Sequence, residues 1–500
     1  MEITNLTLLL IVPLIGAIVC FFMSKEHQHS KYAAIGFSAV TLLLALLFLY
    51  DLSGSNYVHS ESYSWIDTAF IRIGFDIGVD GMSMLMVVLT AVLVLLTCIF
   101  TDSRSETKPS SFFALIMAMQ VGLMGVFMAQ DYFLFFIFWE VSLIPMFFLI
   151  LGWGGPRRHY AGMKFFIYTH VAGVVMLIGI FAIVAQAAAG GTLDFSFAAV
   201  KAASAGFSST FQLLAFGLLF FGFAVKMPLV PFHTWLPDAH VEAPTAGSVL
   251  LAGVMLKMGS YGIIRICLEV LPNGAHQWQA VMIVLALVAI LYGAYACIAQ
   301  RDLKKMVAFS SISHMGMVLL GIATLSEIGV QFAIFQMFAH GLITAVLFMV
   351  CGIAGHNIGT RQIPLLGGMA GKMPLFAAFM MFGFLASLGL PGLVGFVAEF
   401  GLIMAFFDYL MAIGKPWFVI FALASLLLTA GYYLWAMQRS IFGKETDKID
   451  LSHVHDVSKT EGLALGTLCA LIALFGIMPF LIMGMLQGYV ADLALILGVV

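Results

Sequence analysis

Apolar segments long enough to cross a lipid bilayer recur along the whole of this 500-residue chain. A membrane-spanning helix needs about 20 predominantly apolar residues. Only 9% of the residues are charged, against about 25% in a soluble domain, so the sequence predicts an all-α polytopic membrane protein. We place about fourteen transmembrane helices at the approximate limits 5–23, 32–50, 80–100, 111–129, 132–151, 163–187, 211–227, 243–267, 278–298, 306–325, 329–354, 374–407, 416–438 and 461–485, and we expect the last fifteen residues at the membrane interface.

Two of the predicted helices are interrupted. Pro228 and Pro231 follow Lys226 at the end of helix 7, and helix 12 is too long to be straight and contains Gly and Pro between 389 and 395. Breaks at matching places predict two inverted five-helix repeats, helices 4–8 and 9–13, with broken helices 7 and 12. The alternative is chance, because Gly and Pro are common in membrane helices. The resulting parts are 1–110 with helices 1–3, the first repeat 111–268, the inverted second repeat 278–440, and 441–500 with a cytoplasmic loop, helix 14 and a tail.

Basic residues are distributed unequally between the two sets of loops. Sixteen of the 22 lysines and arginines fall on the side of the loop 24–31 and four on the other side, and the remaining two, Lys226 and Lys257, lie within helices. Since basic residues concentrate in cytoplasmic loops, both termini should lie on the outer, periplasmic side of a bacterial inner membrane. The net charge of −3, with both signs mixed in short loops, gives no indication of a nucleic-acid partner.

Four charged residues lie deep in the predicted helices: Glu140 in helix 5, Lys226 at the break of helix 7, Lys257 in helix 8 and Glu399 just after the break of helix 12. A charge in hydrocarbon is costly, so such residues often mark proton or ion pathways. Movement of Glu140 toward or away from Lys226 would load or release a proton, which Lys257 would pass to Glu399. Two alternatives stay open: Glu140 and Lys226 as a structural ion pair, and Lys257 and Glu399 extended to an interface.

Histidines in the same helices are candidate proton relays. His314 and His340 lie in helices 10 and 11, and His170 in helix 6 is a weaker candidate, because a lone membrane histidine more often hydrogen-bonds one helix to another. His233 and His240 do not have the spacing of metal ligands, the six cysteines are scattered, and no nucleotide-binding or haem motif occurs. We therefore expect neither a metal nor a cofactor in this chain.

Residues 222–262, with WLPDAHVEAPTAGSVLLAG between the two membrane lysines, resemble the signature of the antiporter-like subunits of respiratory complex I and of multisubunit Na⁺/H⁺ antiporters. Within this family Glu399 favours the M type, homologous to mitochondrial NADH dehydrogenase subunit 4, because the sister subunits usually carry lysine at that position. Further matching motifs are GVDGMSM at 78–84, WEVSLIP at 139–145, RDLKKMVAFSSISHMG at 301–316, GLPGLVGFVAEF at 389–400 and YYLWAMQRSIFG at 432–443.

This resemblance implies a proton-translocating membrane subunit of NADH:quinone oxidoreductase, which couples electron transfer from NADH to quinone to proton pumping. Flavin, iron–sulfur clusters and quinone would belong to other subunits, and the partners would be the neighbouring membrane subunits, especially the antiporter-like subunits L and N, with lipid and protons. The alternatives are a subunit of a multisubunit Na⁺/H⁺ antiporter or a membrane-bound hydrogenase, and a passive membrane scaffold. The family's hydrophilic axis of Glu, Lys and His would comprise Glu140, Lys226, Lys257, Glu399, His314 and His340.

Overall fold

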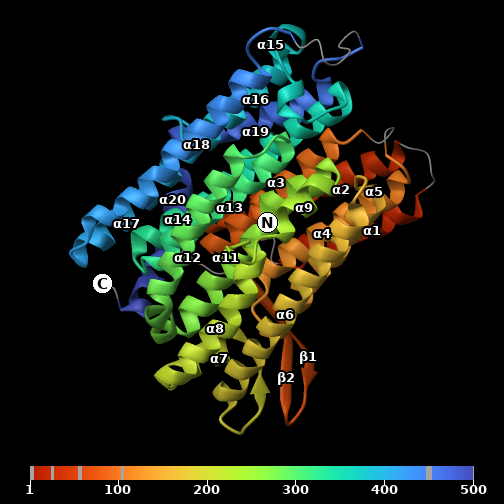
Figure 1. Cartoon of the computed structure of the whole chain (residues 1–500). Coiled ribbons are helices and arrows are strands. Elements are labelled where there is room, and N and C mark those ends of the chain that lie inside the picture. The colour runs from red at the N-terminus through yellow and green to blue at the C-terminus, as the bar shows by residue number, and fades with distance from the viewer. Residues whose placement is uncertain (1–4, 24–27, 54–58, 103–105, 446–452, 499–500) are drawn as a thin grey trace.

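A computed structural model of the chain describes residues 5–23, 28–53, 59–102, 106–445 and 453–498. The described part is a bundle of long helices with one small β-sheet at its lower end (Figure 1). Both chain ends lie outside the described residues, as do Lys25, Arg104 and Lys448, three of the basic residues that we assigned to cytoplasmic loops.

Fourteen helices of the described residues are long and apolar enough to cross a membrane, so the chain is a multi-pass membrane protein as predicted. The helices of the bundle are α1 (Leu8–Phe22), α2 (His29–Ser53), α3 (Gly81–Phe100), α4 (Pro109–Met128), α5 (Tyr132–Trp153), α6 (Arg158–Ala188), α8 (Ser209–Lys226), α10 (Thr245–Leu250), α11 (Leu256–Gly262), α12 (Pro272–Ile298), α13 (Leu303–Ala323), α14 (Glu327–Ile353), α16 (Pro374–Ser387), α17 (Val394–Ala412), α18 (Val419–Ser440), α19 (Lys459–Ile477) and α20 (Phe480–Leu497). Shorter helices are α7 (Phe197–Ser204), α9 (Trp235–Glu242) and α15 (Met369–Lys372).

Both predicted helix breaks are present. The prolines after Lys226 separate α8 from α9, and residues 388–393 separate α16 from α17. In the second break Gly389 and Gly392 have φ angles of +80° and +91°, a left-handed conformation that glycine adopts without steric cost. The freed backbone at each break lies next to a buried charged side chain, which is the arrangement expected where a helix opens onto a polar site.

The three helical segments at the centre of the bundle are almost completely enclosed by protein. Residues 245–268 form one of them, in which π-helical turns, Leu251–Met255 and Ile263–Leu268, follow α10 and α11. The window of this segment tested for hydropathy is 100% buried, and those of α13 and α14 are each 94% buried. These segments carry Lys257, His314 and His340, which are therefore shielded from lipid.

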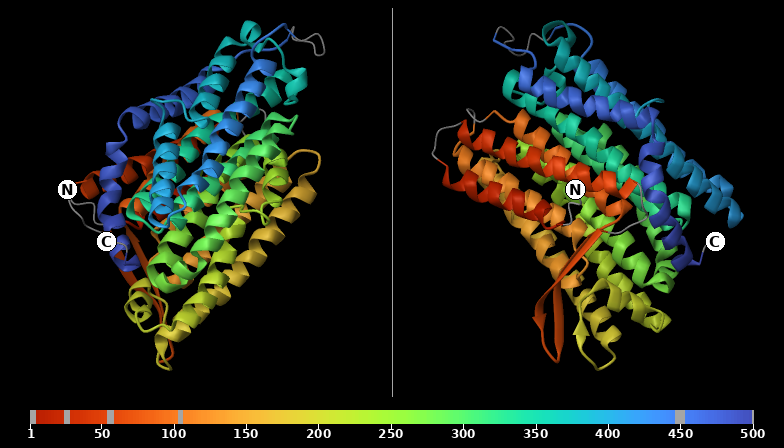
Figure 2. Two further views of the ribbon diagram at one scale, coloured as in Figure 1. Left: turned by 60° about the vertical axis from the view of Figure 1, so that its left-hand side comes forward. Right: turned by 180° about the vertical axis from the view of Figure 1, so that it is seen from behind.

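The end of the predicted fourteenth helix is wrong. It was placed at 461–485, but α19 ends at Ile477 and α20 begins after Pro479, because proline has no N–H to continue the hydrogen-bond ladder of a helix. The two helices run in different directions (Figure 2), and α20 packs against α3 and α14. Residues 480–497 thus form a further apolar helix and not only a tail.

The prediction of a wholly α-helical chain missed a small β-sheet. Strands β1 (His59–Asp67) and β2 (Ile71–Val79) form an antiparallel hairpin, and β3 (Leu193–Asp194) pairs in parallel with β2. Asp131 holds the hairpin to the bundle by accepting a hydrogen bond from the N–H of Gly74 at 3.1 Å. The hairpin projects from the bundle near the lower ends of α6 and α7 (Figure 1).

Candidate functional site

Lys257 in α11 and His340 in α14 form a direct contact at the centre of the bundle. The Lys257 ammonium donates to Nδ1 of His340 at 2.7 Å and to the carbonyl oxygen of Ala252. Glycines make this contact possible: a Cβ on Gly341 would come 2.9 Å from the carbonyl oxygen of Gly253, so only glycine lets α14 approach the π-helical turn so closely. Lys257 is fully buried and His340 is 2% exposed.

His314 and Glu399 continue from this contact toward the second helix break. The rings of His340 and His314 lie 5.4 Å apart between centroids. His314 Nδ1 lies 3.1 Å from Glu399 Oε1, within ion-pair distance, and its Nε2 lies 3.2 Å from the hydroxyl of Ser387, the last residue of α16. The other oxygen of Glu399, Oε2, has no hydrogen-bond partner among the described residues and faces the backbone of Gly389. We call Lys257, His340, His314 and Glu399 together the polar axis.

Glu140 and Lys226 lie near each other but form no ion pair in the part of the chain that the structure describes. The Lys226 ammonium is buried, has no hydrogen-bond partner there, and lies 5.3 Å and 5.8 Å from the ring centroids of Trp139 and Phe165. Glu140 instead pairs with His170 of α6, whose Nδ1 lies 2.9 Å from Glu140 Oε2. His170, only a weaker candidate in the sequence analysis, is thus the partner of Glu140 in the structure.

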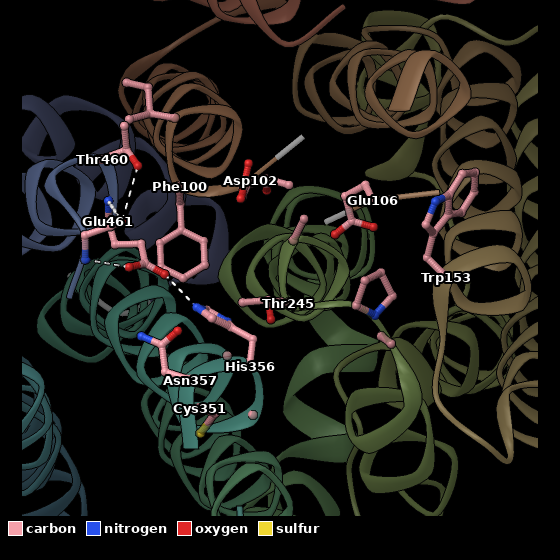
Figure 3. Close-up of a pocket in the computed structure, with 18 of the residues that line it drawn as sticks. Phe100, Asp102, Glu106, Trp153, Thr245, Cys351, His356, Asn357, Thr460 and Glu461 are labelled. Carbon is pink, nitrogen blue, oxygen red and sulfur yellow. Dashed lines mark hydrogen bonds and ion pairs between the residues drawn. The ribbon is translucent and has the colours of Figure 1, made fainter. Parts of the chain in front are cut away.

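A cavity of about 870 Å³ opens at the end of the bundle that carries the start of α2 and the start of α19. Ionisable residues from several elements line it. His356 Nε2 lies 2.8 Å from Glu461 Oε1. Figure 3 shows these two side chains on one side of the cavity and Glu106 on the other, with Asp102 between them. Burial and the neighbouring charge of Asp102 raise the pKa of Glu106 to about 7, so this carboxyl group exchanges protons near neutral pH.

Lys304 connects this cavity with the interior. It lines the cavity, is 2% exposed and donates to the carbonyl oxygen of Ala243 at 2.6 Å, and within the described ranges it forms no ion pair. His240 of α9 lies within electrostatic reach of both Lys304 and Lys257. Both ring nitrogens of His240 are buried and have no hydrogen-bond partner in the residues described, although its ring stacks on Phe348.

A second buried charge cluster lies at the C-terminal end of residues 245–268, the segment that carries Lys257. Arg265 donates to Asp80 and, at 3.0 Å, to Glu269, which also accepts from Lys201 at 3.1 Å and from Tyr489 at 2.7 Å. These contacts join the start of α3, α7 and α20 to the end of residues 245–268. Every charge in the cluster has an opposite partner, which is typical of a structural network.

The structure brings together four of the six predicted site residues in the polar axis and places Glu140 and Lys226 apart from it. Lys257 was expected to pass a proton to Glu399, but it does not contact Glu399 directly, because His340 and His314 lie between them. Lys304 and Arg265 are among the twenty basic residues that the sequence analysis counted in loops, so neither was predicted to be buried. The only signal for Lys304 was its position at the very start of an apolar run, where a loop residue and a buried residue look alike.

A membrane bundle with two interrupted helices, each break beside a buried charge, is typical of membrane transport proteins. A family model described as the transmembrane region of NADH:quinone oxidoreductases and Mrp antiporters matches residues 129–429. The chain belongs to this family.

Three similar proteins cover nearly the whole chain. The F420H2 dehydrogenase subunit M of Methanosarcina mazei is 42% identical over 96% of this chain and 96% of its own length. The NADH-quinone oxidoreductase subunit M of Rhodobacter capsulatus is 38% identical over 98% of this chain and 96% of its own. A chain of respiratory complex I from Thermus thermophilus with bound NADH superposes with a TM-score of 0.88 at 26% identity, covering 99% of this chain and 100% of that chain. These similarities confirm the resemblance to M-type subunits.

Proposed function

We propose that this chain carries protons across the membrane as one subunit of a redox-driven complex. The observation that supports this most is the polar axis: four ionisable side chains, each next to the following one, and each no more than 5% exposed. Lysine, histidine and glutamate each bind and release a proton, and buried ionisable groups in membranes mark proton relays. A passive scaffold would gain more from apolar residues at these positions.

The proton would come from the cavity. Glu106 and water in the cavity would supply Lys304, and His240 would relay the proton to Lys257 at the start of the polar axis. Glu399, beside the break between α16 and α17, would release it toward the opposite face. The cavity is lined by Gln28 and Lys31, next to the loop that the charge distribution places in the cytoplasm, so transport would run from the cytoplasm outward.

Lys304→Met should remove most of the proton uptake that depends on the cavity, because methionine fills a similar volume and cannot bind a proton. Lys305→Met is the matched control: Lys305 is the next residue, is partly exposed and does not line the cavity. The measurement is proton uptake into vesicles that contain the assembled complex. Equal uptake by the two variants would show that the proton reaches Lys257 by another route.

The proposed orientation puts both termini on the outer side of a bacterial inner membrane. Single cysteines at His159 and Lys459 should react with a membrane-impermeant thiol reagent added from the cytoplasm, and a cysteine at Ala205 should react only from outside. All three positions are exposed in the structure. After subtraction of labelling of the native cysteines, reaction of all three from one side would rule out this topology.

The host complex is proposed to be NADH:quinone oxidoreductase, with antiporter-like L and N subunits as neighbours and with flavin, iron–sulfur clusters and quinone in other subunits. One similar protein is a subunit of an F420H2 dehydrogenase, and the matching family includes Mrp antiporters. Purification of the complex in mild detergent and reconstitution into vesicles decides between these hosts. Uptake driven by NADH supports the proposal, uptake driven only by reduced F420 changes the electron donor, and Na⁺-dependent exchange without any donor would overturn it.

A further inference from the structure

We infer that His170 is a positioning residue that competes with Lys226 for the carboxylate of Glu140, and so sets when Lys226 can release its proton. This inference rests on the proposed function, since it concerns the pair of charges that would control loading of the polar axis. In the structure Glu140 contacts His170, the more exposed of these two partners. The buried Lys226 has no hydrogen-bond partner among the described residues.

The contacts define one position of Glu140. His170 Nδ1 donates to Oε2 of Glu140 at 2.9 Å, and the imidazole stacks on Phe166 with centroids 5.4 Å apart and planes inclined by 10°. The second oxygen of Glu140, Oε1, is buried and has no hydrogen-bond partner in the described ranges, and the same is true of the Lys226 ammonium. The Lys226 ammonium lies 5.3 Å from the ring centroid of Trp139, the residue next to Glu140, so the two groups lie on the same side of the bundle core.

Gly173 provides the room for this position. A Cβ at residue 173 would lie 2.7 Å from Glu140 Oε1, which is closer than real Cβ contacts allow. Gly173 follows His170 by one turn of α6, so the same face of that helix supplies both the hydrogen-bond donor and the space. The carboxylate reaches His170 only because residue 173 has no side chain.

The exposure of His170 supports a function rather than simple packing. Its side chain is 44% exposed on a membrane-spanning helix, where an apolar residue would be favoured in hydrocarbon. Lys164, the other charged residue of α6 that forms an ion pair among the described residues, binds Asp238 of α9 at 2.8 Å and does not compete for Glu140. The partner that explains a histidine at this position is Glu140.

A carboxylate close to an ammonium stabilises its charged form, and withdrawal of the carboxylate favours release of the proton. With Glu140 on His170, Lys226 has no counter-ion in contact and passes its proton on. With Glu140 on Lys226, the ammonium is held in its charged form. A protein that lacks the outer partner should therefore keep Glu140 on Lys226 and release protons slowly.

The test compares His170→Leu, His170→Asn and Glu140→Gln, singly and combined, in the assembled complex in vesicles. The measured quantity is the part of proton uptake that Glu140→Gln removes. His170→Leu should lower it about tenfold, which is the effect of losing a hydrogen bond to a charged group. His170→Asn should retain most of it, because the amide N–H replaces Nδ1–H, and His170→Leu should have no further effect when Glu140→Gln is present.

Gly173→Ala is a second route to the same result, since it displaces Glu140 without changing His170. It should lower uptake in the same direction, and again only when Glu140 is present. Normal uptake in His170→Leu beside a defective Glu140→Gln overturns this inference and leaves the proposed function standing. An equal loss from His170→Leu with and without Glu140 also overturns it, as does normal uptake in Glu140→Gln. The proposed function is tested separately, by the variants of Lys304, Lys257 and Glu399.

Discussion

Replacing Lys257 with methionine should stop proton transport through this chain while the complex still assembles. Methionine occupies a similar volume at this fully buried position, but it can neither donate to His340 nor carry a proton. A positioned proton carrier contributes about a hundredfold or more to rate, so the loss should be at least of that order. The measurement is proton uptake per electron pair in vesicles, normalised to the amount of assembled complex. The uptake that remains in the variant is that of the other membrane subunits.

Lys257→Arg separates charge from proton transfer. Arginine keeps a positive charge beside His340, but it remains protonated under all relevant conditions. It should therefore fail as completely as methionine, even though the charge is retained. Substantial uptake in the arginine variant would mean that Lys257 acts as a fixed charge and not as a carrier.

The second large effect is expected for Glu399→Gln. Glutamine is nearly the same size as glutamate and can still contact His314, so the junction of α13 and α17 should hold, but it cannot bind a proton. Proton uptake should fall to the same remaining level as in Lys257→Met, because both residues lie on one path. Asp408→Asn is the matched control: Asp408 lies in the same helix and is exposed, so its loss should leave uptake unchanged.

Much of the fold could be predicted because bilayer thickness fixes helix length. Apolar runs predicted the long helices, and glycines and prolines predicted the breaks before α9 and α17. The boundary at Pro479 was missed because α19 and α20 are both apolar, and hydropathy alone does not separate two consecutive apolar helices. The hairpin of β1 and β2 was missed because residues 51–79, between two predicted membrane helices, were left as a connection, although β2 alternates apolar residues with Gly, Arg and Asp.

The sequence predicted which charged residues belong to the candidate site, but it did not predict which of them contact one another. Depth in an apolar run identified Glu140, Lys226, Lys257 and Glu399, since a buried charge is unusual wherever it occurs. Their partners depend on how helices distant in sequence pack together. The approach of Gly341 to Gly253 sets His340 against Lys257, and no local pattern encodes that distance. For the same reason Glu140 was expected beside Lys226, whereas the structure places it on His170.

The most direct test of the central claim is whether Lys257 and Glu399 act in series. Proton uptake per electron pair should be measured for Lys257→Met, for Glu399→Gln and for the double variant, each normalised to assembled complex. If the polar axis is a single path, either change blocks it, and the double variant should fall no further than each single variant. Losses that multiply in the double variant, or normal uptake in either single variant, would contradict a proton path along Lys257, His340, His314 and Glu399.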